Sequence, residues 1–188
     1  MPSLNPVSNV GSQIERAIIA YLKTAYAAAG VPEPNFYYTN DGEARSVIPN
    51  GLIDVLASDS AETPTFSNDE DYNVRIRAEW PGANQPNQND TDFNLTQINQ
   101  LIGVVVAAMS QTTTGQDRQT TCTNINECGR ALATTGTPQE QADNADMVNF
   151  TCLKVMSRGS IRATNQEGGL YFHETRRYQI GASPSNVD

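Results

Sequence analysis

Residues 93–110 read FNLTQINQLIGVVVAAMS, and this stretch decides the fold. Within it, nine consecutive residues carry no polar side chain, the longest such run in the chain. Asn94 is placed to cap a helix, and Gln97 completes a capping box. Apolar side chains then recur on one helical face, at Ile98, Leu101, Ile102, Val105 and Met109. These signals predict a helix over about 95–110.

The valines at 104–106 favour a strand instead, because β-branched side chains suit extended backbone. The apolar run is long for a strand, and the helix prediction therefore stands. Where a half-exposed helix carries charge, this one has Gly103, Val104 and Ala107. A helix that is apolar all round is normally buried on both sides. These three residues are therefore candidate subunit-interface positions, and a later element of the same chain is the alternative cover.

Length and charge limit the classes of protein to consider. The chain has 188 residues, which predicts one domain over 1–188. Its formal net charge of −9 disfavours tightly held nucleic acid, because phosphate binding needs a basic surface.

Residues 1–9 contain no basic segment and lead into no apolar core, so no secretory signal is expected. The three cysteines show no CxxC spacing, which predicts reduced thiols and leaves a Cys122–Cys128 bridge open.

A second long helix is predicted near the start of the sequence. Its apolar residues share one face, and Ser12 with Glu15 forms a capping box at its beginning. Gly30 is a natural stop. We therefore expect an arm over 1–9 and a helix over 12–29.

Several segments have the pattern of strands. In the clearest, 72–80, apolar side chains alternate strictly with polar ones, which predicts one buried face. Segments 147–157 and 170–181 come later, and 51–58 fits either a strand or a short helical turn. Together they predict an α+β fold with a mixed or antiparallel sheet flanked by two main helices. The polar side chains of the clearest strand are Asn73, Arg75, Arg77 and Glu79.

A polar excursion separates the helix at 95–110 from the last strands. It covers 111–146 and is expected to be a loop or a small helical insertion. Two capped turns are predicted inside it, one after Asn124 and one after Thr137.

Charged residues on the predicted strands and loops are candidates for contacts between subunits. Arginine pairs on two strands either face solvent or form ion pairs with a neighbour, and Glu79 belongs to the same face. The pairs are Arg75 with Arg77 and Arg176 with Arg177. The acidic run Asp69, Glu70 and Asp71 is a candidate for loop or lumen contacts, with a weak metal site as the alternative.

The sequence contains no catalytic or cofactor motif that would identify an enzyme. The single histidine, His173, is expected to be a structural or surface residue. Asp90, Asp92 and Asn94 begin like a calcium loop, but Leu95 and Leu101 stand where glycine and glutamate are required. Phosphate-binding and nucleophile motifs do not occur. We therefore expect no catalytic residue, metal or cofactor, and the chain is predicted not to be an enzyme.

The order of elements, with a strand ending in Trp80-Pro81-Gly82 before the apolar helix, resembles the small tail-terminator and neck proteins of long-tailed bacteriophages. The resemblance implies an α+β fold and a ring, usually a hexamer, that caps the tail tube. It implies a virion protein, assembled in the host cytoplasm, whose partners are further copies of itself, the tail tube protein and a head-completion protein. The excursion at 111–146 departs from the most compact members.

The acidic chain suits such a ring, because it repels the phosphates of DNA that passes through the lumen without being bound. The alternatives are a head-completion or minor connector protein of the neck and, from another class, a cytosolic small-molecule-binding module or enzyme. Contact with a membrane is not expected.

Overall fold

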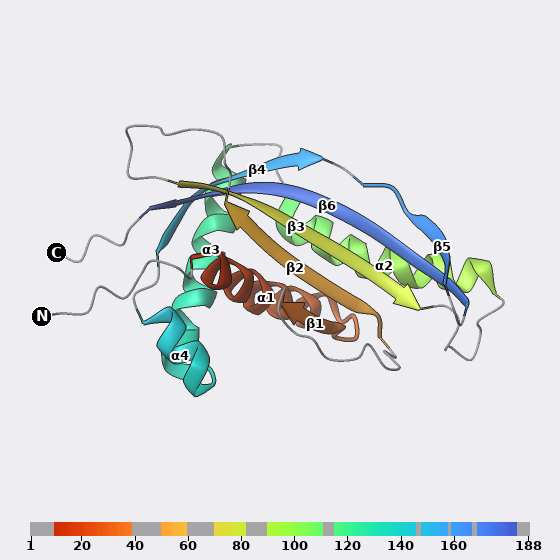
Figure 1. The fold of residues 1–188 in the computed structure, drawn as a ribbon, viewed down its shortest axis with the longest axis horizontal. Helices are drawn as coiled ribbons and strands as arrows, with labels where there is room; N and C mark the ends of the chain where they lie inside the picture. Colours follow the sequence, from red (N-terminus) through yellow and green to blue (C-terminus); the bar gives the residue numbers. More distant parts are fainter. Residues whose placement is uncertain are drawn as a thin grey trace, which may run out of the picture.

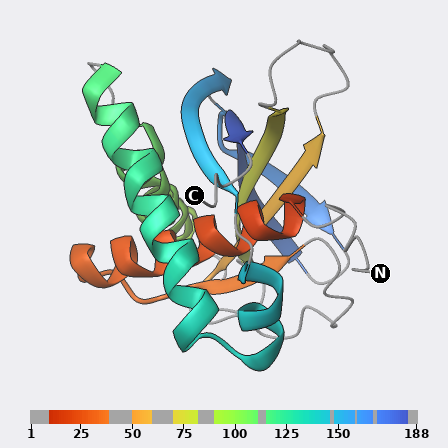
Figure 2. The same ribbon diagram turned by 90° about the vertical axis from the view of Figure 1, so that its left-hand side faces the viewer.

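The computed structural model describes residues 10–38, 50–59, 70–81, 90–110, 115–145, 148–157, 159–166 and 169–183. Helices pack on one face of a curved sheet, as the two views in Figure 1 and Figure 2 show. In chain order the elements are α1 (Val10–Ala29), β1 (Asn35–Tyr38), β2 (Leu52–Asp59), β3 (Glu70–Pro81), α2 (Thr91–Ser110), α3 (Gly115–Thr135), α4 (Pro138–Asn144), β4 (Asn149–Ser157), β5 (Arg162–Gln166) and β6 (Gly169–Ser183).

The sheet is mixed, with strand order β1-β2-β3-β6-β4. The β1–β2 pair is parallel, and the other pairs are antiparallel. Strand β6 pairs with β3 along one edge, while β5 and β4 pair with the two ends of its other edge. The predicted α+β fold with a sheet flanked by helices is confirmed, and the sheet is mixed rather than purely antiparallel.

The alternation predicted for β3 is confirmed, because its apolar side chains all lie in the core. They are Tyr72, Val74, Ile76, Ala78 and Trp80. Side chains from α1, α2 and α3 belong to the same core and include Ile18, Leu22, Ile98, Met109 and Ile125. One face of the sheet is therefore covered by helices and the other is polar.

Helix α1 ends as predicted and starts earlier than predicted. Gly30 has a φ of 65° and follows the last helical residue. The amides of Gly30 and Val31 donate to the carbonyls of Ala27 and Tyr26, which is the Schellman arrangement. The predicted capping box at Ser12 is wrong, because the helix begins at Val10.

Helix α2 is present, but Asn94 is not its cap. The helix begins at Thr91, and the Asp90 carboxylate accepts the backbone amide of Phe93 at 2.9 Å. Asn94 is buried and accepts a hydrogen bond from Trp80 Nε1 at 2.9 Å. The tertiary contact with Trp80 thus uses the side chain that local capping rules assigned to the helix start.

The excursion at 111–146 is mostly helical, and α3 is as long as the two predicted main helices. The residues after Asn124 are helical as predicted, but the predicted cap there is wrong, because Asn124 lies inside α3. The capping box at Thr137 and Glu140, with Pro138 at the first helical position, is confirmed at the start of α4. The buried side of α3 is partly polar, so apolar periodicity does not mark this helix in the sequence. The buried residues are Thr121, Cys122, Ile125, Asn126 and Gly129.

Two further expectations are resolved among the strands. Segment 51–58 is a strand, β2, rather than a helical turn. Strand β5, which forms a hairpin with β6, lies between the last two predicted strands, where no strand was predicted. The arm over 1–9 lies outside the described residues.

We find no helix in the described part of the chain that is long and apolar enough to span a membrane.

Candidate functional site

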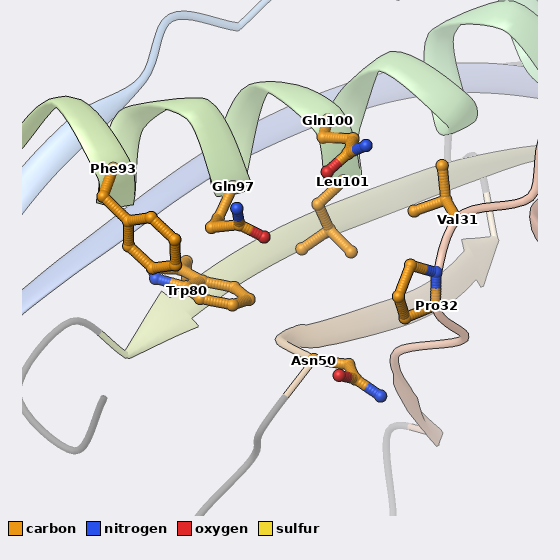
Figure 3. Close-up of a pocket in the computed structure, with 8 residues that line it drawn as sticks. All are labelled: Val31, Pro32, Asn50, Trp80, Phe93, Gln97, Gln100 and Leu101. Carbon is orange, nitrogen blue, oxygen red and sulfur yellow. The ribbon is translucent and has the colours of Figure 1, made fainter. Parts of the chain in front are cut away.

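A small pocket opens beside Trp80, where the N-terminal half of α2 meets the segment after α1. We call it the Trp80 pocket. Its volume is about 160 Å³. Its apolar walls come from segments far apart in the sequence: Val31, Pro32, Trp80, Phe93 and Leu101. Figure 3 shows the Trp80 and Phe93 rings at one end, Val31 and Pro32 at the other, and Leu101 between them.

Amide side chains give this pocket polar groups near its apolar walls. They are Asn50, Gln97 and Gln100, of which Asn50 and Gln100 are exposed. Such a combination holds an apolar group by burial and orients its polar neighbours by hydrogen bonds. No sequence motif pointed to this pocket, because its residues come together only in the folded chain.

Two side chains that line the pocket, Leu101 and Trp80, pack closely against Gly51, and the Trp80 ring is anchored. Gly51 has a φ of 79°, and an added Cβ would lie 2.9 Å from Leu101 Cδ2 and 3.1 Å from Trp80 Cε3. Trp80 is held by the hydrogen bond to Asn94, and both side chains are buried. The tryptophan is therefore fixed in place before any ligand arrives.

The polar face of the sheet, opposite the helices, carries two of the predicted interface arginines. Arg75 pairs with Asp54 at 3.0 Å, and Arg77 pairs with Glu79 at 2.7 Å. Asp54 and Glu79 are buried, whereas the arginines are partly exposed. Both arginines thus have carboxylate partners in their own chain, which also supplies the counter-charge that those buried carboxylates need.

Arg176 and Arg177 are adjacent in sequence and point to opposite faces of the sheet. Arg176 lies on the helix-covered face, where it forms an ion pair with buried Glu174. Arg177 is exposed on the polar face, directly opposite Arg75 across the β3–β6 pair.

The acidic run at the start of β3 is only partly described. Asp69 lies outside the described residues, and so does the side chain of Glu70. Asp71 accepts a hydrogen bond from Gln179 at 3.2 Å. Among the described residues, no group of three or more His, Cys, Asp or Glu side chains is arranged to hold a metal ion.

The outward side of α2 beyond its first turn, which we call the α2 outer face, carries no charge, since the one charged residue of the helix is Asp92 in that first turn. Its exposed members recur at helical spacing: Thr96, Gln100, Gly103 and Ala107. A Cβ added to Gly103 would meet nothing within 4 Å. Val104, in contrast, is only 8% exposed and packs in the core of its own chain. Of the three residues predicted to need a second cover, the chain itself therefore covers one.

The pKa values of His173 and Cys128 both depart from the ordinary values of these side chains. Burial, and then the charge of Arg77, lower the pKa of His173, so its imidazole is neutral at pH 7. Burial, and then nearby Glu127, raise the pKa of Cys128. Cys122 and Cys128 are free thiols, and the alternative of a bridge between them is not realised.

A scan against known protein-family models found no match to this chain, and a search of curated protein sequences found none either.

Proposed function

We propose that this chain is a structural virion protein of a long-tailed bacteriophage, a tail terminator whose copies form a ring at the end of the tail tube. The support from the sequence is the order of elements that resembles this family, together with the acidic charge expected to keep passing DNA unbound. The ring is expected to be a hexamer that joins the tube to a head-completion protein.

The α2 outer face is the observation that carries the proposal. Residues 93–110 contain no charged side chain, although part of this segment is exposed. Gly103 and Ala107 allow the backbone of a second helix to approach closely, since neither has a bulky side chain. No segment that the structure describes covers these two residues, so a neighbouring subunit is the cover that we propose.

A sharp test replaces one small residue of this face by a long cation. Ala107→Arg is expected to convert the ring to monomers, because the guanidinium would be buried without a partner. Ala131→Arg is the matched control, since Ala131 is an exposed alanine on α3. The measurement is native mass spectrometry together with negative-stain images of particles.

Rings of tail width for the wild type and for Ala131→Arg, with monomers for Ala107→Arg, are the expected result. A wild-type protein that stays monomeric at all concentrations would overturn the ring. Rings that persist in Ala107→Arg would remove α2 from the interface. A ring of twelve copies would favour a head-completion or minor connector protein.

The Trp80 pocket is the observation that favours a different class, a small-molecule-binding module or enzyme. Its volume is about 160 Å³, whereas sites for drug-sized ligands have about 300–1,000 Å³. A pocket of this size fits one side chain better than a whole metabolite. A monomer whose melting temperature rises with an added metabolite would support this alternative.

A further inference from the structure

We propose that the Trp80 pocket binds an apolar side chain from residues 4–7 of a second copy of this chain. The inference deepens the proposed function, on which it rests, by naming a contact between neighbouring subunits. The pocket lining includes Gln100 of the α2 outer face but neither Gly103 nor Ala107.

The size and walls of the pocket define its ligand. A cavity of about 150 Å³ with apolar walls accommodates a group of roughly the size of benzene. The Trp80 pocket has about 160 Å³ and combines two aromatic rings with a proline and amides near its walls. Grooves lined by aromatic side chains recognise proline-containing extended segments, whose backbone carbonyls accept hydrogen bonds from the groove. The fitting occupant is therefore an uncharged extended segment with an aliphatic side chain.

Residues 1–9 have this chemistry. They lie outside the described residues, and their sequence is MPSLNPVSN. No side chain among them is charged, and prolines stand at positions 2 and 6. Leu4 and Val7 are three residues apart, which places them on the same side of a polyproline II helix with three residues per turn.

The same segment cannot reach the pocket of its own chain. It joins α1 at Val10, whereas the pocket begins at Val31, just beyond the other end of α1. The 20 residues of α1 span about 30 Å at about 1.5 Å per residue. Leu4 is six residues before Val10 and reaches at most about 20 Å from it. The donor must therefore be another copy.

This placement also gives the contact a direction. In Figure 1, α1 starts at its red end on the left and finishes on the right, on the side of the β3 arrowhead. Donor segment and pocket thus lie at opposite ends of one helix. A contact between two such different surfaces is head-to-tail, and repeated head-to-tail contacts close into a ring when the rotation permits.

The experiment uses full-length protein carrying Leu4→Ser and Val7→Ser, to which a peptide of residues 1–9 is added. Trp80 is the single tryptophan of the chain, so its fluorescence reports on the pocket. We expect a saturable change in emission. A peptide with serine at both apolar positions should bind at least about tenfold more weakly, because the aliphatic burial is lost.

Two protein variants locate the binding site. Gln97→Tyr, which fills the pocket, should abolish the response, whereas Gln119→Tyr on the exposed side of α3 should leave it unchanged. Either an unresponsive Trp80 or equal binding of both peptides would overturn the inference. A pocket already filled by residues 47–49, which adjoin Asn50 in the same chain, would give the first of these results.

The titration is then repeated on protein that also carries Ala107→Arg. Binding that persists in this monomeric variant shows that the pocket acts without a ring. Rings of wild-type protein together with an unresponsive pocket would sink this inference and leave the proposed function standing. If the pocket binds the peptide in a protein that never forms rings, the proposed function is overturned and the binding of residues 4–7 by the pocket still stands.

Discussion

Gly51 combines a positive φ with crowded surroundings, so it tolerates a side chain poorly for two reasons. Its φ is 79°, and its Cα faces Leu101, Trp80 and the carbonyl of Glu79. Gly51→Ala should destabilise the protein by about 3 kcal/mol, through left-handed backbone strain and crowding. Urea denaturation measures the loss.

Gly30→Ala is the matched control for this change. Gly30 also has a positive φ, 65°, but a Cβ there meets nothing within 4 Å. Gly30→Ala should therefore destabilise the protein only through left-handed backbone strain, by about 1–2 kcal/mol. Equal losses for the two variants would show that the crowding at Gly51 is relieved by movement of the pocket wall.

The capping box of α4 predicts a dependence on pH at the residue scale. Partial burial by itself raises the pKa of Glu140, but hydrogen bonds from Thr137 outweigh this effect and lower it. A lowered pKa in the folded state stabilises the fold above the ordinary glutamate value of about 4.3. That stabilisation is lost as the pH falls through the lowered value.

Thr137→Ala should cost about 1 kcal/mol near neutral pH. Its deficit relative to the wild type should shrink as the pH falls below about 4, because Glu140 becomes protonated in both proteins. Thermal melts across this pH range measure it. Thr134→Ala, an exposed threonine that bonds a helical carbonyl, should change little at any pH. A loss of stability in Thr137→Ala that does not change with pH would show that the ionisation of Glu140 does not contribute to the capping box.

At the scale of elements, the side-chain amide of Asn126 links α3 to β4 by making the two hydrogen bonds that a further strand would make there. Asn126 Nδ2 donates to the Phe150 carbonyl at 2.9 Å, and Asn126 Oδ1 accepts the Phe150 amide at 2.8 Å. Asn126 is buried. The side chain thus satisfies both backbone groups of one edge-strand residue, beside a register shift in β4.

Asn126→Asp should destabilise the protein by about 2 kcal/mol, because a buried carbonyl loses its donor and faces a carboxylate. Gln119→Glu makes the same amide-to-acid change at an exposed position of α3 and should be nearly neutral. Urea denaturation of both variants compares them. Equal stability of the two would mean that water replaces the lost donor.

The two long helices predicted from sequence are linked through tyrosines of α1. The Tyr26 hydroxyl donates to the Leu101 carbonyl at 2.6 Å, and the Tyr21 hydroxyl donates to the Ala108 carbonyl at 3.1 Å. Both contacts lie on the side of α2 away from its outer face. The helix pair is therefore held together from within, and the outer face is left for the neighbouring subunit that we propose.

For the whole molecule, the strand order predicts how stability is distributed. Strands β3 and β6 are central and paired with each other over their length, whereas β1 is a short edge strand. Amide hydrogen exchange of the monomeric Ala107→Arg variant should be slowest in β3 and β6 and fastest in β1. If the amides of β1 were protected from exchange as strongly as those of β3, the prediction that the sheet opens first at its edge would be wrong.

The sequence by itself determined the elements whose signals are local. Alternation marked β3, and apolar periodicity with the Gly30 stop marked α1. The α2 prediction held over most of its length, and the box at Thr137 marked α4. These patterns hold because backbone geometry repeats every 2 or 3.6 residues and caps act within one turn.

Only the tertiary structure decided which polar side chains serve the fold and which form a site. Asn94 serves Trp80 instead of a helix start, Glu15 accepts the Ala57 amide, and Asn126 supports β4. The Trp80 pocket and the partners of the arginines likewise depend on residues distant in sequence. A buried polar group needs a hydrogen-bond partner, and the fold supplies that partner from a residue far away in the sequence. A local sequence pattern therefore cannot predict which residue it is.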